Sequence, residues 1–123
     1  MKCKQLDHVA LHVADLEESR RFYASVLNLE EMPRPDFDFP GAWFRIGQSQ
    51  ELHLIGDRKA EVSSHRRGTH FALLVDDIVA WESHLKTTAA EFQPPKSRPD
   101  GATQIFVTDP DGHWVELCQP TGQ

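Results

Sequence analysis

Apolar and polar residues alternate along two short segments of the chain, residues 6–16 (LDHVALHVADL) and 68–78 (GTHFALLVDDI). A period of two residues is typical of a strand with one face buried. The two predicted apolar faces are Val9, Leu11 and Val13, and Phe71, Leu73 and Val75. A histidine falls on the opposite face in each segment, His8 in the first and His70 in the second.

The two segments also match each other residue by residue. His8 aligns with His70, and Asp15 aligns with Asp77, at the same offset of 62 positions. Several matches in one register indicate an internal repeat, so we expect one small module to occur twice.

A helix is predicted after each of these strands. Asp15 is a favourable N-cap with Glu18 three residues later, and Asp76 or Asp77 caps the second helix. The predicted buried faces of the helices have helical spacing. They comprise Ser19, Phe22, Tyr23, Val26 and Leu27, then Ile78, Trp81 and Leu85.

Shorter strand-like runs follow each helix, at 42–47 and 51–56, then at 103–109 and 113–119. The DPDG sequence at Asp109–Gly112 predicts a hairpin turn. We therefore expect an α+β fold of two βαβββ modules that form a cupped mixed sheet. Module 1 covers about 6–57, a polar linker covers 58–67, and module 2 covers about 68–120.

Composition and charge narrow the class of protein. A length of 123 residues suits a single domain, and a net charge of −6 without a basic stripe argues against nucleic acid as a partner. Cys3 and Cys118 are too few for a disulfide scaffold, and no segment resembles a signal peptide or a membrane span. We expect a cytoplasmic protein with no membrane partner.

Strand alternation selects candidate metal ligands. In the run 51–55, Leu52 and Leu54 should face the helix, which leaves Glu51 and His53 on the other face. In 113–119, Val115 and Leu117 should face the helix, which turns Glu116 away from it. The ligand-type residues that face away are His8, His53, His70 and Glu116, with Glu51 as an alternative to His53.

Imidazole and carboxylate groups suit zinc, nickel, cobalt, manganese or iron. A histidine in a strand is more often an ordinary hydrogen-bonding residue, and His65, His84 and His113 are assigned to that class. The strand parity and the repeat distinguish the candidate ligands from these three.

The repeated module and the sequences ELHLI and DPDGHWVELCQP resemble the vicinal oxygen chelate superfamily, the group of glyoxalases, bleomycin-resistance proteins and extradiol dioxygenases. The resemblance covers Leu6 to about Pro120. It implies a divalent metal held by His8, His53, His70 and Glu116, and a small-molecule substrate that binds through two neighbouring oxygens. It also implies a homodimer.

The resemblance favours a metal-dependent lyase or isomerase of glyoxalase type, with Glu116 as the catalytic proton acceptor. An extradiol dioxygenase, a thiol transferase and a non-enzymatic drug-binding protein remain alternatives. His12 stands where glutathione-dependent members commonly carry an arginine, so the use of glutathione is left open. Aromatic and basic residues of the strands should line the substrate pocket, chiefly Trp43, Arg45, Phe106 and Trp114, with Phe37 and Phe39 beside them.

Overall fold

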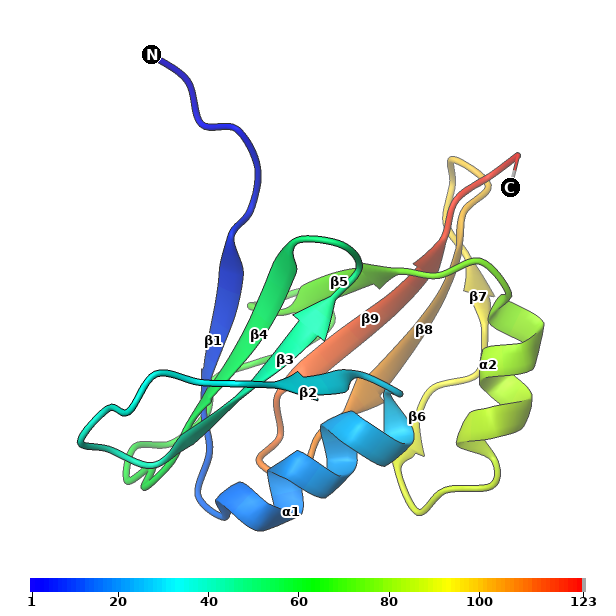
Figure 1. Cartoon of the computed structure of the whole chain (residues 1–123). Coiled ribbons are helices and arrows are strands. Elements are labelled where there is room, and N and C mark those ends of the chain that lie inside the picture. The colour runs from blue at the N-terminus through cyan, green and yellow to red at the C-terminus, as the bar shows by residue number, and fades with distance from the viewer. Residues whose placement is uncertain (123) are drawn as a thin grey trace. The chain divides into compact units, whose positions relative to one another are not determined.

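A computed structural model describes residues 1–122 of the chain (Figure 1). The chain divides into two compact units, one formed by Met1–Ala60 and the other beginning at Glu61.

The first unit is a four-stranded mixed sheet with one helical segment. Its strands are β1 (His8–His12), β2 (Glu30–Met32), β3 (Gly41–Ile46) and β4 (Gln50–Ile55). They lie in the order β1-β4-β3-β2, with β1 parallel to β4 and the other neighbours antiparallel. The first and last strands of the unit are therefore adjacent, although a helix and two strands separate them in the sequence.

The helical segment of the first unit has two parts, α1 (Leu16–Arg21) and a π-helical turn η1 (Phe22–Val26). The Asp15 carboxylate accepts a hydrogen bond from the Glu18 backbone N–H at 3.1 Å, as the sequence predicts for an N-cap. Asn28 has a φ of 55°, a left-handed conformation that ends the helix.

The core of the first unit lies between this helical segment and the sheet. α1 packs against β3 and β4, whose inward residues Phe44, Leu52 and Leu54 are fully buried. The residues between them, including His53, are half-buried on the other face. Burial of the apolar face thus fixes which side of the sheet carries the polar residues.

The second unit repeats this arrangement. Its elements are β5 (Phe71–Leu74), α2 (Ile78–Leu85), β6 (Glu91–Phe92), β7 (Lys96–Ser97), β8 (Thr103–Thr108) and β9 (Trp114–Gln119). The sheet order is β5-β9-β8-β6, with β7 also paired to β8. Again the first and last strands are parallel neighbours.

The caps and turns of the second unit also follow the sequence. The Asp77 carboxylate accepts a hydrogen bond from the Ala80 N–H at 3.0 Å and caps α2, which packs on β8 and β9. In the turn between β8 and β9, the Asp109 carboxylate accepts from the backbone N–H groups of Asp111 and His113. Gly112 closes this turn with a φ of 92°.

The predicted α+β class is confirmed, since two mixed sheets dominate and the helices are few and short. Each unit has a strand, a helix and then strands, although β2, β6 and β7 are too short to leave a pattern in the sequence. None of the helices in residues 1–122 has the length and apolar character needed to cross a bilayer.

Candidate functional site

Three rings form a continuous stack on the polar face of the first unit. The His53 imidazole lies 3.9 Å from the Trp43 ring, with the two planes 2° from parallel, and 4.1 Å from the His8 ring on its other side. Strand register explains the stack, because Trp43 is directly opposite His53 on β3, and β1 is its parallel neighbour on the other side. Two of the predicted ligands of this unit are therefore brought together.

Each of these histidines also contacts a carboxylate. His53 Nε2 lies 2.8 Å from Glu51 Oε1, and His8 Nδ1 lies 2.8 Å from Asp7 Oδ2. If those nitrogens donate their protons to the carboxylates, the second nitrogen of each ring keeps its lone pair. Carboxylate–histidine pairs of this kind orient metal-ligating imidazoles.

The remaining two predicted ligands meet in the second unit. His70 Nε2 lies 3.2 Å from Glu116 Oε1, and the Gln104 amide donates to Glu116 Oε2 at 2.9 Å. The other nitrogen of His70 faces the carbonyl oxygen of Gly68 at 3.3 Å. Glu116 is only 5% exposed, so both of its oxygens depend on these neighbours.

The two ring nitrogens of His70 cannot both donate a hydrogen bond while the imidazole is neutral. Both ring nitrogens face oxygen atoms, but a neutral imidazole carries a single N–H and can donate to only one of them. If Nδ1 donates to the Gly68 carbonyl, the lone pair of Nε2 points toward the Glu116 carboxylate. In that tautomer a metal ion could lie between the two groups, whereas in the other tautomer Nε2 donates directly to the Glu116 carboxylate.

The two units place these residues at equivalent register positions. Ala10 is opposite His53 in the first parallel pair, and Ala72 is opposite Glu116 in the second. The internal repeat therefore equates Glu116 with His53, just as the sequence equates His70 with His8.

Aromatic and basic side chains surround both pairs. In the second unit, Phe106 contacts His70 edge to face at 5.5 Å and lies 6.0 Å from Trp114. In the first, Arg45 Nη1 lies 3.9 Å from Glu51 Oε2. Trp43 and Phe106 therefore contact the predicted ligands His53 and His70. Arg45 lies near the alternative ligand Glu51, and Trp114 lies next to Phe106.

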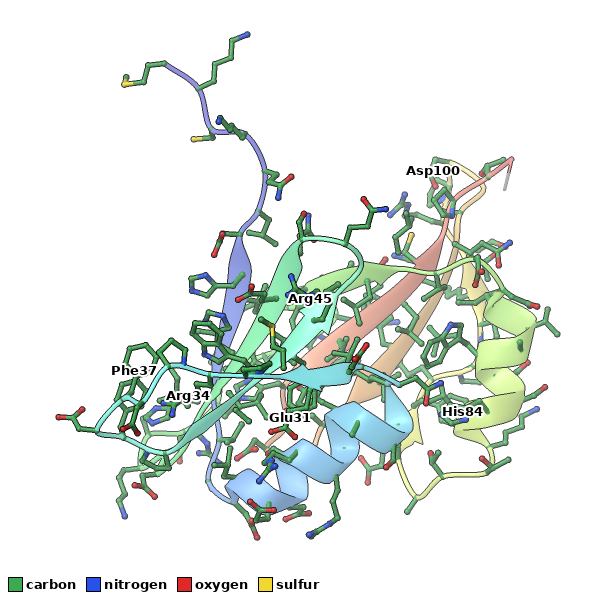
Figure 2. The ribbon with its side chains drawn as sticks, in the orientation of Figure 1. Glu31, Arg34, Phe37, Arg45, His84 and Asp100 are labelled. Carbon is green, nitrogen blue, oxygen red and sulfur yellow. The ribbon has the colours of Figure 1, made fainter. Side chains whose placement is uncertain are left out.

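The loop before β3 extends the aromatic surface of the first unit. The Arg34 guanidinium lies over the rings of both Phe37 and Phe39, at 4.9 and 4.8 Å, and donates to the Phe39 carbonyl at 2.9 Å. Figure 2 shows Arg34 and Phe37 together in this loop. Phe37 in turn lies 6.2 Å from Trp43, which connects the loop to the histidine stack.

Cys118 lies on the same strand as Glu116, two residues further on. Burial raises the pKa of its thiol, and the negative charge of Glu116 raises it further. The thiol is therefore held in its protonated form, which suits a packing role rather than that of a nucleophile.

Within residues 1–122, no three histidine, cysteine, aspartate or glutamate side chains come together as a group that could hold a metal ion. The ligand-type residues are instead arranged as a pair in each unit, His8 with His53 and His70 with Glu116. Strand parity predicts that these residues share a face, but it does not predict that His8 stacks on His53 or that His70 contacts Glu116.

A family model for the Glyoxalase/Bleomycin resistance protein/Dioxygenase superfamily matches residues 5–117. The chain belongs to this superfamily. The match spans both units, so the repeat and the two sheets are features of the superfamily fold.

Relatives of this superfamily member include a protein named as uncharacterized, YwbC of Bacillus subtilis, which is 30% identical over 94% of the chain and 98% of its own length. The lactoylglutathione lyase of Pseudomonas putida is 28% identical over 94% of the chain and 84% of its own length. A solved glyoxalase family protein from Enterococcus faecalis is 28% identical, with a TM-score of 0.75 over 94% of this chain and 97% of that one.

The chemistry of the paired donor groups suits a divalent metal ion, although no three of them come together within residues 1–122. Each unit supplies two neighbouring donor groups, and each of the three histidines has an oxygen partner that can fix its tautomer. Gln104 and Asp7, which provide two of the supporting contacts, were missed by the sequence analysis. Gln104 could have been identified from its position, because it lies two residues before Phe106 on β8 and so shares the same face of the strand.

Proposed function

We propose that this chain is a divalent-metal-dependent enzyme of glyoxalase type, a lyase or isomerase that acts on a small substrate with two neighbouring oxygens. The observation that carries the proposal is the buried Glu116 carboxylate, which faces His70 Nε2 on one side and the Gln104 amide on the other. A carboxylate placed in this way can accept a proton, while His70 and Gln104 hold it in a defined orientation.

The metal would be held by His8, His53, His70 and Glu116, and zinc, nickel, cobalt, manganese and iron all suit these donors. Glu51 is the alternative to His53, since its carboxylate lies 2.8 Å from the ring of that residue. Support for His53 comes from its stacking, which fixes the imidazole plane between Trp43 and His8.

Glu116 would act as the general base that removes a proton from a carbon next to a carbonyl group. Its Oε2 atom is held by the Gln104 amide, so the proton would be taken at Oε1, the oxygen that faces His70. A bound divalent metal supplies Lewis-acid stabilisation for the oxyanion that develops on such a substrate.

Trp43, Arg45, Phe106 and Trp114 would bind the substrate. Their aromatic surfaces suit a partly apolar molecule, and the Arg45 guanidinium suits a negative charge. The family relationship to a lactoylglutathione lyase supports the reaction class.

We include a homodimer and a cytoplasmic location in the proposal. Leu74, on the edge strand β5, is 77% exposed, and a partner copy related by a two-fold axis would cover it. Cys3 and Cys118 are both free thiols, which suits a reducing compartment. Light scattering at micromolar concentration tests the dimer, and a monomeric mass would contradict it.

The test of function begins with protein purified without chelator or nickel resin. Bound metal is measured by mass spectrometry, and isomerisation of α-ketoaldehyde adducts with several thiols, glutathione included, is followed by thioester absorbance. We expect near-stoichiometric metal and turnover that Glu116→Gln reduces at least a hundredfold, with metal affinity reduced less. His84→Ala is the matched control, because His84 lies on α2 beside Trp81.

The same assays distinguish the alternatives. Ring cleavage of a catechol with iron bound would indicate a dioxygenase, and thiol addition to an epoxide would indicate a transferase. Tight binding of an aromatic drug without bound metal or turnover would indicate a sequestering protein, and the proposal would then be wrong.

A further inference from the structure

The second unit contains a cavity of about 940 Å³, a volume typical of small-molecule sites. Two segments form most of its wall, residues 65–67 before β5 and residues 93–99 around β7. Gln104 and Phe106 of β8 complete it. All of the lining residues therefore belong to one unit.

The wall of this cavity is strongly basic. Arg66, Arg67 and Lys96 line it, and no carboxylate within residues 1–122 forms an ion pair with any of the three. Arg98 also lines it but is paired with Asp100 at 2.7 Å. The chain as a whole has a net charge of −6, so the positive charge of this wall is a local departure from the overall composition.

Lys96 is positioned by the sheet. It is directly opposite Gln104 in the antiparallel pair of β7 and β8, so the two side chains share a face. Pro94, Pro95 and Pro99 flank this short strand and restrict its backbone. The Lys96 ammonium is therefore attached to a segment with little conformational freedom to lose on binding.

The two arginines are positioned by a turn. The Ser64 hydroxyl donates to the Thr69 carbonyl at 2.7 Å and accepts from the Trp114 backbone N–H at 2.9 Å, which attaches the turn to β9. The His65 ring, at the start of the turn, lies 4.8 Å from the Trp114 ring. Arg66 and Arg67 thus project from a segment that is fixed on both sides.

The cavity also adjoins the proposed catalytic carboxylate. The Gln104 amide in its wall donates to Glu116 Oε2 at 2.9 Å, and the Phe106 ring in its wall contacts His70. A molecule bound in the cavity would therefore lie one side chain away from Glu116.

We propose that this cavity binds a doubly negative oxyanion group of phosphate type, carried by the small molecule on which the enzyme acts. Three cations that form no ion pair within residues 1–122 favour more than one negative charge, and the two guanidinium groups suit tetrahedral oxygens in a bidentate geometry. Only the placement of the reactive end of that molecule near Glu116 rests on the proposed function. Binding of the anion itself does not.

The experiment measures binding of inorganic phosphate by calorimetry to metal-free protein at moderate ionic strength, where distant surface charges are screened. The chain carrying both Arg66→Gln and Arg67→Gln should bind phosphate at least tenfold more weakly than the unmodified chain, and Lys96→Gln should also bind it more weakly. The matched control carries Arg21→Gln and Lys86→Gln, which remove the same number of exposed positive charges from α1 and from the C-cap of α2. We expect it to bind phosphate like the unmodified chain at moderate salt.

Acetate and succinate define the chemical class of the anion. Both should bind at least tenfold more weakly than phosphate, and equal binding of succinate would overturn the assignment to phosphate-type groups. Absence of saturable phosphate binding, or equal loss in the control variant, would overturn the site. Denaturant unfolding of each variant confirms that the fold is intact.

The Glu116→Gln protein separates the two proposals. It should bind phosphate at least as tightly as the unmodified chain, because a nearby negative charge has been removed. If every turnover assay fails while phosphate binding behaves as expected, the proposed reaction is wrong and the anion site stands. If turnover occurs but phosphate does not bind, the anion site is wrong and the proposed reaction stands.

Discussion

The His53 imidazole stacks on the Trp43 indole with ring centroids 3.9 Å apart and planes 2° from parallel. Such a contact holds the imidazole in one orientation, while Glu51 holds its Nε2 atom. Trp43 therefore sets the plane of the His53 ring, and Glu51 sets its tautomer. Substitution of one of these neighbours tests its effect without removing the other.

Replacing Trp43 with alanine should weaken both the fold and the proposed metal site. We expect the free energy of unfolding to fall by about 1–3 kcal/mol, since the ring contact and part of its apolar burial are lost. Divalent metal affinity, measured by calorimetry, should fall about tenfold because His53 loses one of the contacts that orient its ring. Trp43→Phe keeps a stacking ring and should retain most of the affinity. Unchanged affinity in Trp43→Ala would show that the stack does not orient a ligand.

His8→Ala and His70→Ala should each lower divalent metal affinity at least tenfold, or about 1.4 kcal/mol. Affinity should also weaken in acidic solution, because only neutral imidazole binds a metal. His65→Ala and His84→Ala should leave the metal content unchanged. If both ligand variants retain full occupancy, the proposed site is wrong, and the drug-binding alternative becomes the preferred one.

The two cysteines should react at very different rates. Cys3 is exposed, whereas burial and the Glu116 charge raise the pKa of Cys118 and keep its thiol protonated. Alkylation at pH 8, followed by mass spectrometry, should therefore modify Cys3 first. Glu116→Gln should speed the modification of Cys118, because loss of the negative charge lowers the pKa of the thiol. An unchanged rate would show that burial, and not the Glu116 charge, controls the reactivity of this thiol.

Asp100 should titrate at unusually low pH. Its carboxylate accepts hydrogen bonds from the Arg98 guanidinium at 2.9 and 2.7 Å, which lowers its pKa from 3.8 to about 2. Because the folded pKa is lowered, the contribution to stability is present above pH 3.8 and is lost as the pH falls through about 2. Figure 2 places Asp100 at the end of its loop, away from the rest of the sheet.

Carbon NMR of the Asp100 carboxyl group tests this prediction. Arg98→Gln should return the midpoint toward 3.8, while Arg21→Gln, on α1, should leave it unchanged. A low midpoint that persists in Arg98→Gln would assign the effect to the Ala102 backbone N–H, which donates to the same carboxylate at 3.1 Å.

The sequence predicted the features that depend on a regular alternation of buried and exposed residues. Leu52, Leu54, Val115 and Leu117 are fully buried, as the alternation indicated, and the residues between them face the other side of each sheet. Asp15 and Asp77 cap helices because an N-cap depends on local geometry only. These features require no knowledge of distant contacts.

Other features depend on long-range contacts or on a single irregular turn. The π-helical turn Phe22–Val26 changes the spacing of the apolar stripe by too little to be visible in the sequence. The segment 58–67 reads as an unpatterned linker, yet Ser64 attaches its end to Trp114, 50 positions away. The basic wall of the cavity was missed for the same reason. The joint use of His8, His53, His70 and Glu116 as ligands remains a prediction.

The parallel pairing of first and last strands also governs how each sheet can assemble. The hairpins of β3 with β4 and β8 with β9 join neighbours in the sequence, whereas the pairing of His8 with Glu51 must close a loop of about 40 residues. We therefore expect the hairpins to form early and the opening strands β1 and β5 to dock late, so that the rate of folding is set by this docking step. Destabilising substitutions in β1 should accordingly slow refolding more than they accelerate unfolding.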